Sequence, residues 1–401
     1  MEKLNRLISH ARETVPYYRN LPAGELRSLE ELKNIPLLEK EVLRENADQL
    51  RSSRQGLRPR RKTTGGSTGA AVTLHKSAEG MAKELAATWR GYSWAGIDIG
   101  DKQARFWGIP HDKKDRLRAH LIDLVTNRLR FSAFAFSESD FENYISKLEE
   151  FNPKYFYGYV SMIRQLAEYI ENNNIVFNFR PSAIITTAEV LTQPDRKKIE
   201  SVFKCKVYNE YGCGEIGTIA HECSSGSLHL TSENIILEIV DESGNSVPPG
   251  KQGEIVVTDL VNYSMPLIRY KIKDYGEIAI KSCACGVRLP CLENIYGREY
   301  DYLVNSRGEK FHGEFFLYMV ENITKTGISF RGVQFVQSPD LSIVVRLVGD
   351  DLDKKALSNY FIKNIVEKMN DNVDISVDFV EEIQRESSGK LRVVKRLTDY
   401  M

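Results

Sequence analysis

The sequence contains no long hydrophobic run and no excess of charge of either sign. No stretch of its 401 residues approaches the roughly 20 consecutive apolar residues that span a bilayer. Lysine plus arginine and aspartate plus glutamate are equal at 55 each, so no overall field attracts nucleic acid or an anionic membrane. The opening Met1–Arg6 also lacks the apolar core of a signal peptide. We therefore expect a cytoplasmic protein without a nucleic-acid partner or a membrane span.

Cysteine is scarce, and one common nucleotide-binding motif is missing. The six cysteines are expected to be free or metal-bound in a cytosolic chain rather than disulfide-bonded. No Gly-x-x-x-x-Gly-Lys-[Ser/Thr] follows a strand, which argues against a P-loop NTPase. The composition, 42% hydrophobic and 27% charged, is that of an ordinary globular protein of two or three domains.

The hydrophobic pattern changes twice along the chain. Helical and strand patterns alternate up to about residue 208, and Ala183–Thr187 is a short apolar run of the buried parallel type. From Leu228 onward, short strands are separated by tight turns. We predict an α/β fold. A large N-terminal domain (1–297) has parallel sheets and a small antiparallel β region, and a small α+β domain (298–401) follows.

A loop rich in glycine and hydroxyl groups is the first sign of chemistry. In Lys62–Gly69, seven of the eight residues are Gly, Ser or Thr. Glycines let backbone N–H groups approach a ligand closely and hydroxyls add short donors, which suits a loop that wraps a polyphosphate. The same composition suits a flexible hairpin turn, so the loop alone decides nothing.

Three further features follow in order. Asn209–Glu215 comes after a predicted strand and offers an aromatic face, glycines and Glu215, a carboxylate for Mg²⁺. Met265–Asp274 ends in an acceptor for ribose hydroxyls. Ser387–Arg392 places Lys390 on a turn, as a mobile cation for developing negative charge. Each feature is weak alone, but their joint order favours the phosphate-binding interpretation of the loop.

With these motifs, the sequence resembles the adenylate-forming superfamily of acyl-CoA synthetases, nonribosomal adenylation domains and luciferases. Within it, the chain is most similar to the phenylacetate–CoA ligase branch, especially that branch's capsular-polysaccharide-associated proteins. The resemblance extends over essentially the whole chain and includes Val15–Arg19, Ile35–Lys40, Thr186–Glu189 and Gly297-Arg298.

The resemblance implies a role for each matching position, with ATP and Mg²⁺ as cofactors. Lys390 would bridge carboxylate and α-phosphate, after which the C-terminal domain would rotate as a mobile lid. Glu215 would hold Mg²⁺. The implied nucleotide-binding residues are Thr63, Thr64, Gly65, Gly66, Ser67, Thr68 and Gly69 for the phosphates; Thr187, Ala188, Glu189, Asn209, Glu210, Tyr211 and Gly212 for adenine; and Asp274 with Arg298 for the ribose and the domain boundary.

The chain departs from the family pattern at the hinge. An acidic residue usually stands two positions after the Arg of Gly-Arg, whereas here that position is Tyr300 and Asp301 follows. Either residue is then the candidate hinge. The aromatic acyl-pocket region, Trp107–Ile109 with Tyr157-Gly158, does not identify the acid.

The cysteines form two short blocks. His221-Glu222-Cys223 and Cys283-Ala284-Cys285-Gly286 predict a structural zinc site with His221, Cys223, Cys283 and Cys285 as ligands. Cys291 or Cys213 could replace one of them, and the alternative is reduced, half-buried thiols. His111, His120 and His229 have no partner pattern, and we expect core or surface histidines there.

The leading hypothesis is an ATP-dependent ligase that converts a small carboxylic acid into an acyl-adenylate and pyrophosphate. The acyl group then passes to a thiol, of CoA or of a carrier protein. The resemblance also allows an amine acceptor, for example an amino sugar or amino acid in capsule, O-antigen or secondary-metabolite biosynthesis. A non-catalytic nucleotide-binding scaffold is the third reading, and the joint presence of Glu215, Asp274, Arg298 and Lys390 argues against it.

Overall fold

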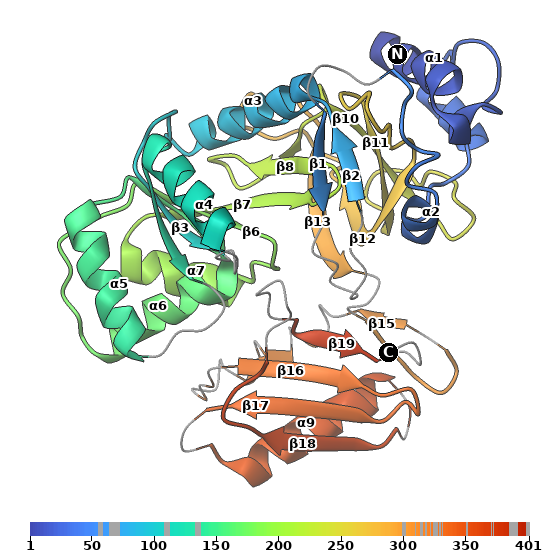
Figure 1. Cartoon of the computed structure of the whole chain (residues 1–401). Coiled ribbons are helices and arrows are strands. Elements are labelled where there is room, and N and C mark those ends of the chain that lie inside the picture. The colour runs from blue at the N-terminus through green and yellow to red at the C-terminus, as the bar shows by residue number, and fades with distance from the viewer. Residues whose placement is uncertain are drawn as a thin grey trace.

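The computed structural model combines one large sheet, helices on both of its faces, and a small C-terminal unit (Figure 1). It describes residues 1–54, 59–63, 73–107, 113–132, 138–298 and 302–397, except for 309, 313–315, 317–318, 321, 324–327, 329, 331, 350–351, 370, 372 and 385–391. Across these residues, every helix is too short or too polar to cross a membrane.

The large sheet has eleven strands in the order β10-β11-β12-β13-β9-β8-β7-β6-β5-β3-β4. Their bounds are β3 (Gln103–Trp107), β4 (Arg128–Ser132), β5 (Tyr155–Tyr159), β6 (Ala183–Thr187), β7 (Lys206–Cys213), β8 (Gly217–Glu222), β9 (Leu228–Leu230), β10 (Ile235–Val240), β11 (Gly253–Asp259), β12 (Tyr270–Ile278) and β13 (Cys291–Arg298). Strands β4, β3, β5, β6 and β7 are parallel, and the others are antiparallel to their neighbours.

The predicted α/β class is confirmed, and the structure adds how its two parts join. Strand β7 turns straight back into β8, so the parallel half and the antiparallel half are hydrogen-bonded into one sheet. Strand β13 also keeps Arg298 in this sheet, opposite Asp274 of β12, one residue beyond the expected domain boundary. That boundary remains a prediction.

The parallel half is covered by helices on both faces. The covering helices are α3 (Ala78–Trp94), α4 (Lys113–Val125), α5 (Glu138–Phe151), α6 (Val160–Asn172) and α7 (Gln193–Phe203). Side chains alternate along a strand: Tyr155 and Tyr157 of β5 pack with Tyr92 of α3, whereas Phe156 packs on the side of α5, α6 and α7. Burial on both faces explains why every residue of β5 except Gly158 is aromatic.

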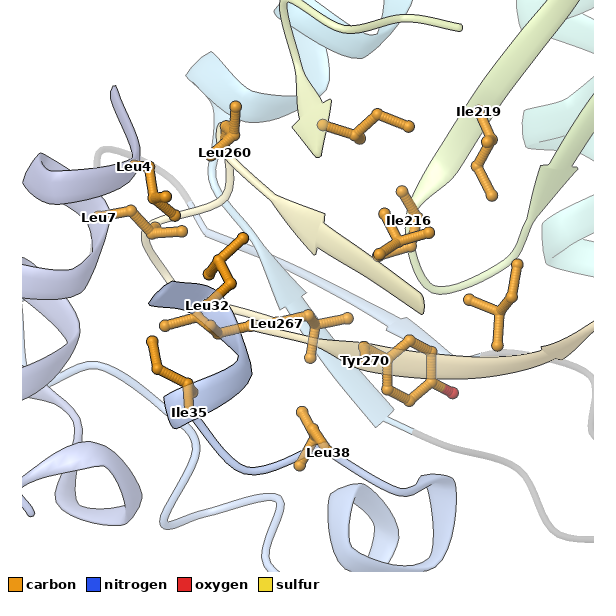
Figure 2. Close-up of a cluster of buried hydrophobic side chains, with 14 of the residues drawn as sticks. Leu4, Leu7, Leu32, Ile35, Leu38, Ile216, Ile219, Leu260, Leu267 and Tyr270 are labelled. Atoms are coloured by element: carbon orange, nitrogen blue, oxygen red, sulfur yellow. The ribbon is translucent and has the colours of Figure 1, made fainter. Parts of the chain in front are cut away.

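The N-terminal segment packs against the antiparallel half (Figure 2). It contains α1 (Glu2–Thr14), the 3₁₀ helices Pro16–Tyr18 and Leu29–Asn34, and α2 (Lys40–Glu45). Leu7 of α1, Leu32 and Leu38 share one core with Leu267 and Tyr270, and each such fully buried side chain contributes roughly 1.5–3 kcal/mol. The first 50 residues therefore belong to this half of the molecule.

The C-terminal unit has a separate hydrophobic core. Its elements are β14 (Tyr302–Val304), β15 (Lys310–His312), β16 (Gly332–Gln337), β17 (Ile343–Val348), α9 (Lys354–Met369), β18 (Ile375–Phe379) and β19 (Val394–Arg396). Leu357, Phe361 and Ile365 form one face of α9 and pack in a core with Phe335 and Val345 of the sheet. All residues of this core lie at or beyond 303, which supports a separate C-terminal domain.

Candidate active site and cysteine cluster

The turn between β7 and β8 is built for close backbone approach. A Cβ added to Gly212 would lie 2.4 Å from the carbonyl oxygen of Gly217, and Gly217 itself has a φ of +101°. Both positions therefore require glycine. The turn brings Glu215, the predicted metal ligand, to the edge of the sheet with 7% of its surface exposed.

Two predicted nucleotide-binding residues from distant parts of the chain meet directly. The Tyr211 hydroxyl donates a 2.7 Å hydrogen bond to Oδ2 of Asp274, which is 6% exposed. Arg298 stands opposite Asp274 in the register of β12 and β13. The structure thus gathers an aromatic ring, a carboxylate and the backbone of an arginine at one place.

Lys40 is the ion-pair partner of Glu215. Its Nζ lies 3.4 Å from Oε1 of Glu215, and the two side chains are 22% and 8% exposed. A separation of 3.4 Å exceeds the 2.7–2.9 Å of a strong charge-assisted hydrogen bond, so the contact is an ion pair and not a short hydrogen bond. Carboxylate oxygens suit Mg²⁺, which proteins usually bind through one or two carboxylates and substrate phosphates. Glu215 fits that role.

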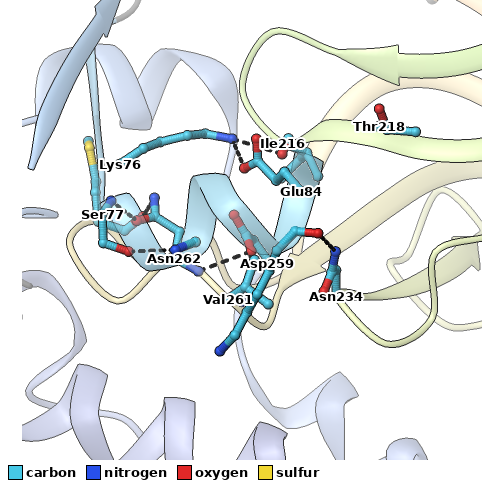
Figure 3. Close-up of polar contacts among 12 residues, drawn as sticks. Lys76, Ser77, Glu84, Ile216, Thr218, Asn234, Asp259, Val261 and Asn262 are labelled. Atoms are coloured by element: carbon cyan, nitrogen blue, oxygen red, sulfur yellow. Dashed lines mark hydrogen bonds and ion pairs between the residues drawn. The ribbon is translucent and has the colours of Figure 1, made fainter. Parts of the chain in front are cut away.

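A buried polar network supports the turn from beneath (Figure 3). Lys76, 2% exposed at the end of β2 (Thr73–Lys76), pairs with Glu84 of α3 and donates a 2.8 Å hydrogen bond to the carbonyl of Ile216. Nearby, burial raises the pKa of Asp259 to about 6, and its Oδ1 accepts from the N–H of Val261. Lys76 thereby holds Ile216, the residue next to Glu215, in place. The sequence did not predict this role, because a single lysine at the end of a strand matches no motif.

The adenine motif predicted over Asn209–Gly212 is split between two faces of β7. Alternation turns Glu210 away from Tyr211, and its Oε2 accepts a 3.0 Å hydrogen bond from the Tyr92 hydroxyl of α3. Burial raises the pKa of Glu210 to about 7. The Glu210 side chain thus contacts α3, and adenine binding by Asn209–Gly212 remains a prediction.

The second adenine segment, Thr187–Glu189, follows β6. Thr187 is buried, and Ala188 adopts a left-handed φ of +68°, a conformation that costs a non-glycine residue about 1 kcal/mol or more and is concentrated at functional sites. Glu189 accepts hydrogen bonds from the backbone N–H and hydroxyl of Ser161, at 2.7 and 2.9 Å. Its carboxylate thereby caps α6, a structural role that the motif did not reveal.

Several predicted residues lie outside the described part of the chain. These are Thr64–Gly69 of the glycine-rich loop, the catalytic Lys390, and both hinge candidates, Tyr300 and Asp301. Thr63 ends β1 (Arg60–Thr63), which pairs with β2 so that Thr63 stands opposite Thr73.

The cysteine cluster contains a different histidine from the one predicted. Cys223, His229, Cys283 and Cys285 have ligand atoms that all lie within 4.8 Å of one another. Nε2 of His229 is 3.2 Å from Sγ of Cys285. The three predicted cysteines are present, but His221 is not part of this group. His229, expected to be a core or surface histidine, is fully buried and lies among the thiols.

Strand register explains the exchange of histidines. β8 and β9 are antiparallel with His221 opposite His229, a pairing that no local spacing reveals. The His221 ring packs against Gly91 and Tyr92 of α3, its buried Nε2 has no hydrogen-bond partner among the described residues, and burial lowers its pKa to about 3. His221 is a core histidine, and His229 reaches the thiols.

The cluster fits a tetrahedral zinc ion. Zn–S bonds of about 2.3 Å and Zn–N bonds of about 2.0 Å put tetrahedral ligand atoms roughly 3.5–3.8 Å apart, which is compatible with the observed spacing. Nδ1 of His229 lies 3.1 Å from the Leu289 carbonyl, and a proton there leaves Nε2 as the lone-pair donor. Cys291 approaches that same Nδ1, at 3.3 Å, so it is not placed as a replacement ligand. Cys213 also lies outside the group.

Comparison with known proteins gives consistent relatives. A family model described as the CapK C-terminal domain matches residues 303–397. Protein CapK of Staphylococcus aureus is 27% identical over 388 residues, covering 93% of this chain and 82% of CapK. A phenylacetate-coenzyme A ligase of Thermus thermophilus is 27% identical over 337 residues, covering 76% of this chain and 70% of the ligase.

Solved structures share the fold. A 2-hydroxyisobutyryl-CoA ligase in the postadenylation state, in complex with 2-HIB-AMP, superposes with a TM-score of 0.76 at 18% identity, covering 98% of this chain and 88% of that one. The anthranilate CoA ligase AuaEII in complex with anthranoyl-AMP superposes with a TM-score of 0.58 at 15% identity, covering 83% and 65%. At these identities the likeness establishes the fold alone.

Proposed function

We propose that the chain, a phenylacetate–CoA ligase-like homologue of protein CapK, is an AMP-forming carboxylate ligase of the adenylate-forming superfamily. The proposed reaction joins a carboxylic acid to the α-phosphorus of ATP and releases pyrophosphate, and the acyl group then passes to an acceptor. The observation that carries the proposal is the Tyr211–Asp274 contact beside the turn that holds Glu215.

In this proposal each residue has a defined task. Asp274 accepts hydrogen bonds from the ribose hydroxyls, and the Tyr211 ring lies along the adenine. Glu215 holds Mg²⁺, which when bound supplies positive charge to the phosphates. Lys390 approaches the carboxylate and the α-phosphate and lowers the repulsion between the two anions. ATP binding at Thr63–Gly69 completes the site.

We propose a thiol such as that of CoA as the acceptor, because the second relative above is a phenylacetate-coenzyme A ligase. An amine acceptor is the alternative, because the capsule-associated relatives leave that route open and residues 303–397 match the CapK C-terminal domain. The enzyme is incubated with ATP, an active acid and either CoA or an amine. The molecular mass of the product, measured by mass spectrometry, distinguishes a thioester from an amide.

Acid-dependent exchange of labelled pyrophosphate into ATP, without CoA, tests the first half-reaction. Screening carboxylic acids in this assay should identify acids that stimulate exchange, and Lys390→Ala should abolish the stimulation for every active acid. Unchanged exchange in that variant would contradict the adenylation mechanism.

We also propose that Cys223, His229, Cys283 and Cys285 hold a structural Zn²⁺. Four protein ligands leave no open coordination position for substrate. The ion would tie the ends of β8 and β9 to the loop between β12 and β13, which carry the four ligands, and so stabilise the antiparallel half on which Asp274 lies.

A further inference from the structure

Residues 35–40, here named the strap, are fastened along the strand that carries Asp274. The Leu38 N–H donates to the carbonyl of Arg269 at 2.9 Å, and the Lys271 N–H donates to the carbonyl of Leu38 at 3.0 Å. These bonds form a parallel bridge between Leu38 and Tyr270. The Arg269 guanidinium, 2% exposed, also donates to the carbonyl of Ile35 at 2.9 Å.

A second set of contacts fixes the residue between Leu38 and Lys40. The Glu39 carboxylate pairs with Lys271 at 2.9 Å and with Lys273 at 3.4 Å. Lys273 directly precedes Asp274 in sequence. Backbone and side-chain contacts therefore fix Leu38 and Glu39, the two residues before Lys40. The position of the Lys40 ammonium follows from these contacts.

The strap places the Lys40 ammonium beside Glu215, the carboxylate that would hold Mg²⁺ in the proposed function. Nζ of Lys40 lies 3.4 Å from Oε1 of Glu215, and among the described residues this is the ion pair that Glu215 makes. A carboxylate that is only 8% exposed is costly to leave without a counter-charge. Lys40 supplies that charge at ion-pair distance, and Lys62 adds an electrostatic attraction to the same carboxylate.

We propose that Lys40 is the resident counterion of Glu215 in the nucleotide-free protein and yields the carboxylate to the divalent ion that arrives with ATP. The inference rests on the proposed function. An ammonium beside Oε1 repels a second cation at the same carboxylate, so a free divalent ion binds poorly. A divalent ion that arrives on ATP brings phosphate oxygens as further ligands and displaces the ammonium. Lys40 is thus a positioning residue that makes the site select the metal–nucleotide complex.

Mn²⁺ binding to the zinc-loaded, nucleotide-free protein, followed by electron paramagnetic resonance, tests this without any turnover. Lys40→Met should bind Mn²⁺ about tenfold or more tightly than the wild type, because one competing charge near the carboxylate is gone. Lys40→Arg should behave like the wild type. Lys33→Met, which removes an exposed lysine seven residues earlier, should change nothing. Adding Glu215→Gln to Lys40→Met should abolish the gain.

Two results would overturn the proposal: an Mn²⁺ affinity of Lys40→Met within about twofold of wild type in a variant with an unchanged circular dichroism spectrum, or a gain that survives Glu215→Gln. The titration contains neither acid nor ATP. Failure of the proposed ligase function would appear separately, as the absence of acid-stimulated pyrophosphate exchange in the wild type.

Discussion

At the scale of single residues, the contact between Tyr211 and Asp274 spans 63 positions of sequence and lies at the centre of the proposed nucleotide site. The phenol already donates to Oδ2 of Asp274, so the carboxylate is oriented before any ligand arrives. Preorganisation of this kind lowers the cost of ordering the site on binding.

Replacing Asp274 by Asn should weaken ATP binding while leaving the fold intact. Loss of a charged acceptor for the ribose removes a hydrogen bond of about 1.5–3 kcal/mol, or roughly a 10- to 150-fold rise in Kd, measurable by isothermal titration calorimetry. Glu242→Gln removes an exposed carboxylate in a turn and is the matched control. An ATP Kd of Asp274→Asn equal to that of the control would remove Asp274 from the nucleotide site.

The two opposed histidines of β8 and β9 make a direct test of the zinc proposal. His229→Ala should lower bound zinc from about one per chain to well below one and reduce thermal stability, because metal binding is coupled to folding. His221→Ala should retain the metal. Metal content by mass spectrometry decides the matter, and zinc lost from His221→Ala but kept in His229→Ala would reverse the assignment.

Glu210 should impose a pH dependence on stability. Its folded pKa of about 7 lies above the unfolded value of about 4.3, so the folded state binds the extra proton. Stability is therefore greatest below the unfolded pKa and is lost as the pH rises from about 4.3 to about 7. Glu210→Gln should stabilise the protein by up to about 3 kcal/mol at pH 8 and by much less at pH 5.

Urea unfolding of both proteins at the two pH values checks this, and the comparison cancels the opposite trend expected from His221, whose folded pKa is lowered. Equal gains at pH 5 and pH 8 would show that Glu210 is not the titrating group. The charged and titratable groups that face it are Tyr92, Tyr157 and Arg105.

At the scale of elements, Arg269 fastens the strap to β12. Its guanidinium pairs with both oxygens of Glu238 at 3.1 Å and donates to the carbonyls of Ile35 and Gly244. Arg269→Met leaves a buried carboxylate without its partner and should cost about 3–5 kcal/mol. Adding Glu238→Met should recover much of that loss in urea unfolding. A double variant no more stable than the single one would assign the effect to the backbone contacts instead.

Sequence patterns predicted individual motifs better than they predicted which strands and segments lie next to one another. The β7 turn, the carboxylate after it and the three thiols follow from local spacing. His229 and Lys40 could not be found in this way, because their partners are set by strand register and by docking of the strap onto β12. The continuity of the sheet through β7 and β8 was equally invisible, since local patterns do not say which strands are neighbours.

At the scale of the whole molecule, one sheet gathers groups from three distant segments. Lys40 of the strap pairs with Glu215, which follows β7. Its neighbour Glu39 pairs with Lys273, the residue before Asp274 on β12, and Asp274 accepts a hydrogen bond from Tyr211 of β7. The C-terminal unit, with its own core, contains Lys390. This division suits an enzyme in which one unit holds the nucleotide and the other brings the cation to it.

Transfer of oxygen from the acid to AMP tests adenylation most directly. The acid is labelled with ¹⁸O in its carboxylate and incubated with ATP and the acceptor. If the carboxylate oxygen attacks the α-phosphorus, cleavage of the acyl–oxygen bond by the acceptor leaves one labelled oxygen in AMP, and mass spectrometry detects it. We predict labelled AMP and unlabelled pyrophosphate. ADP with labelled inorganic phosphate, or AMP without label, would contradict the mechanism.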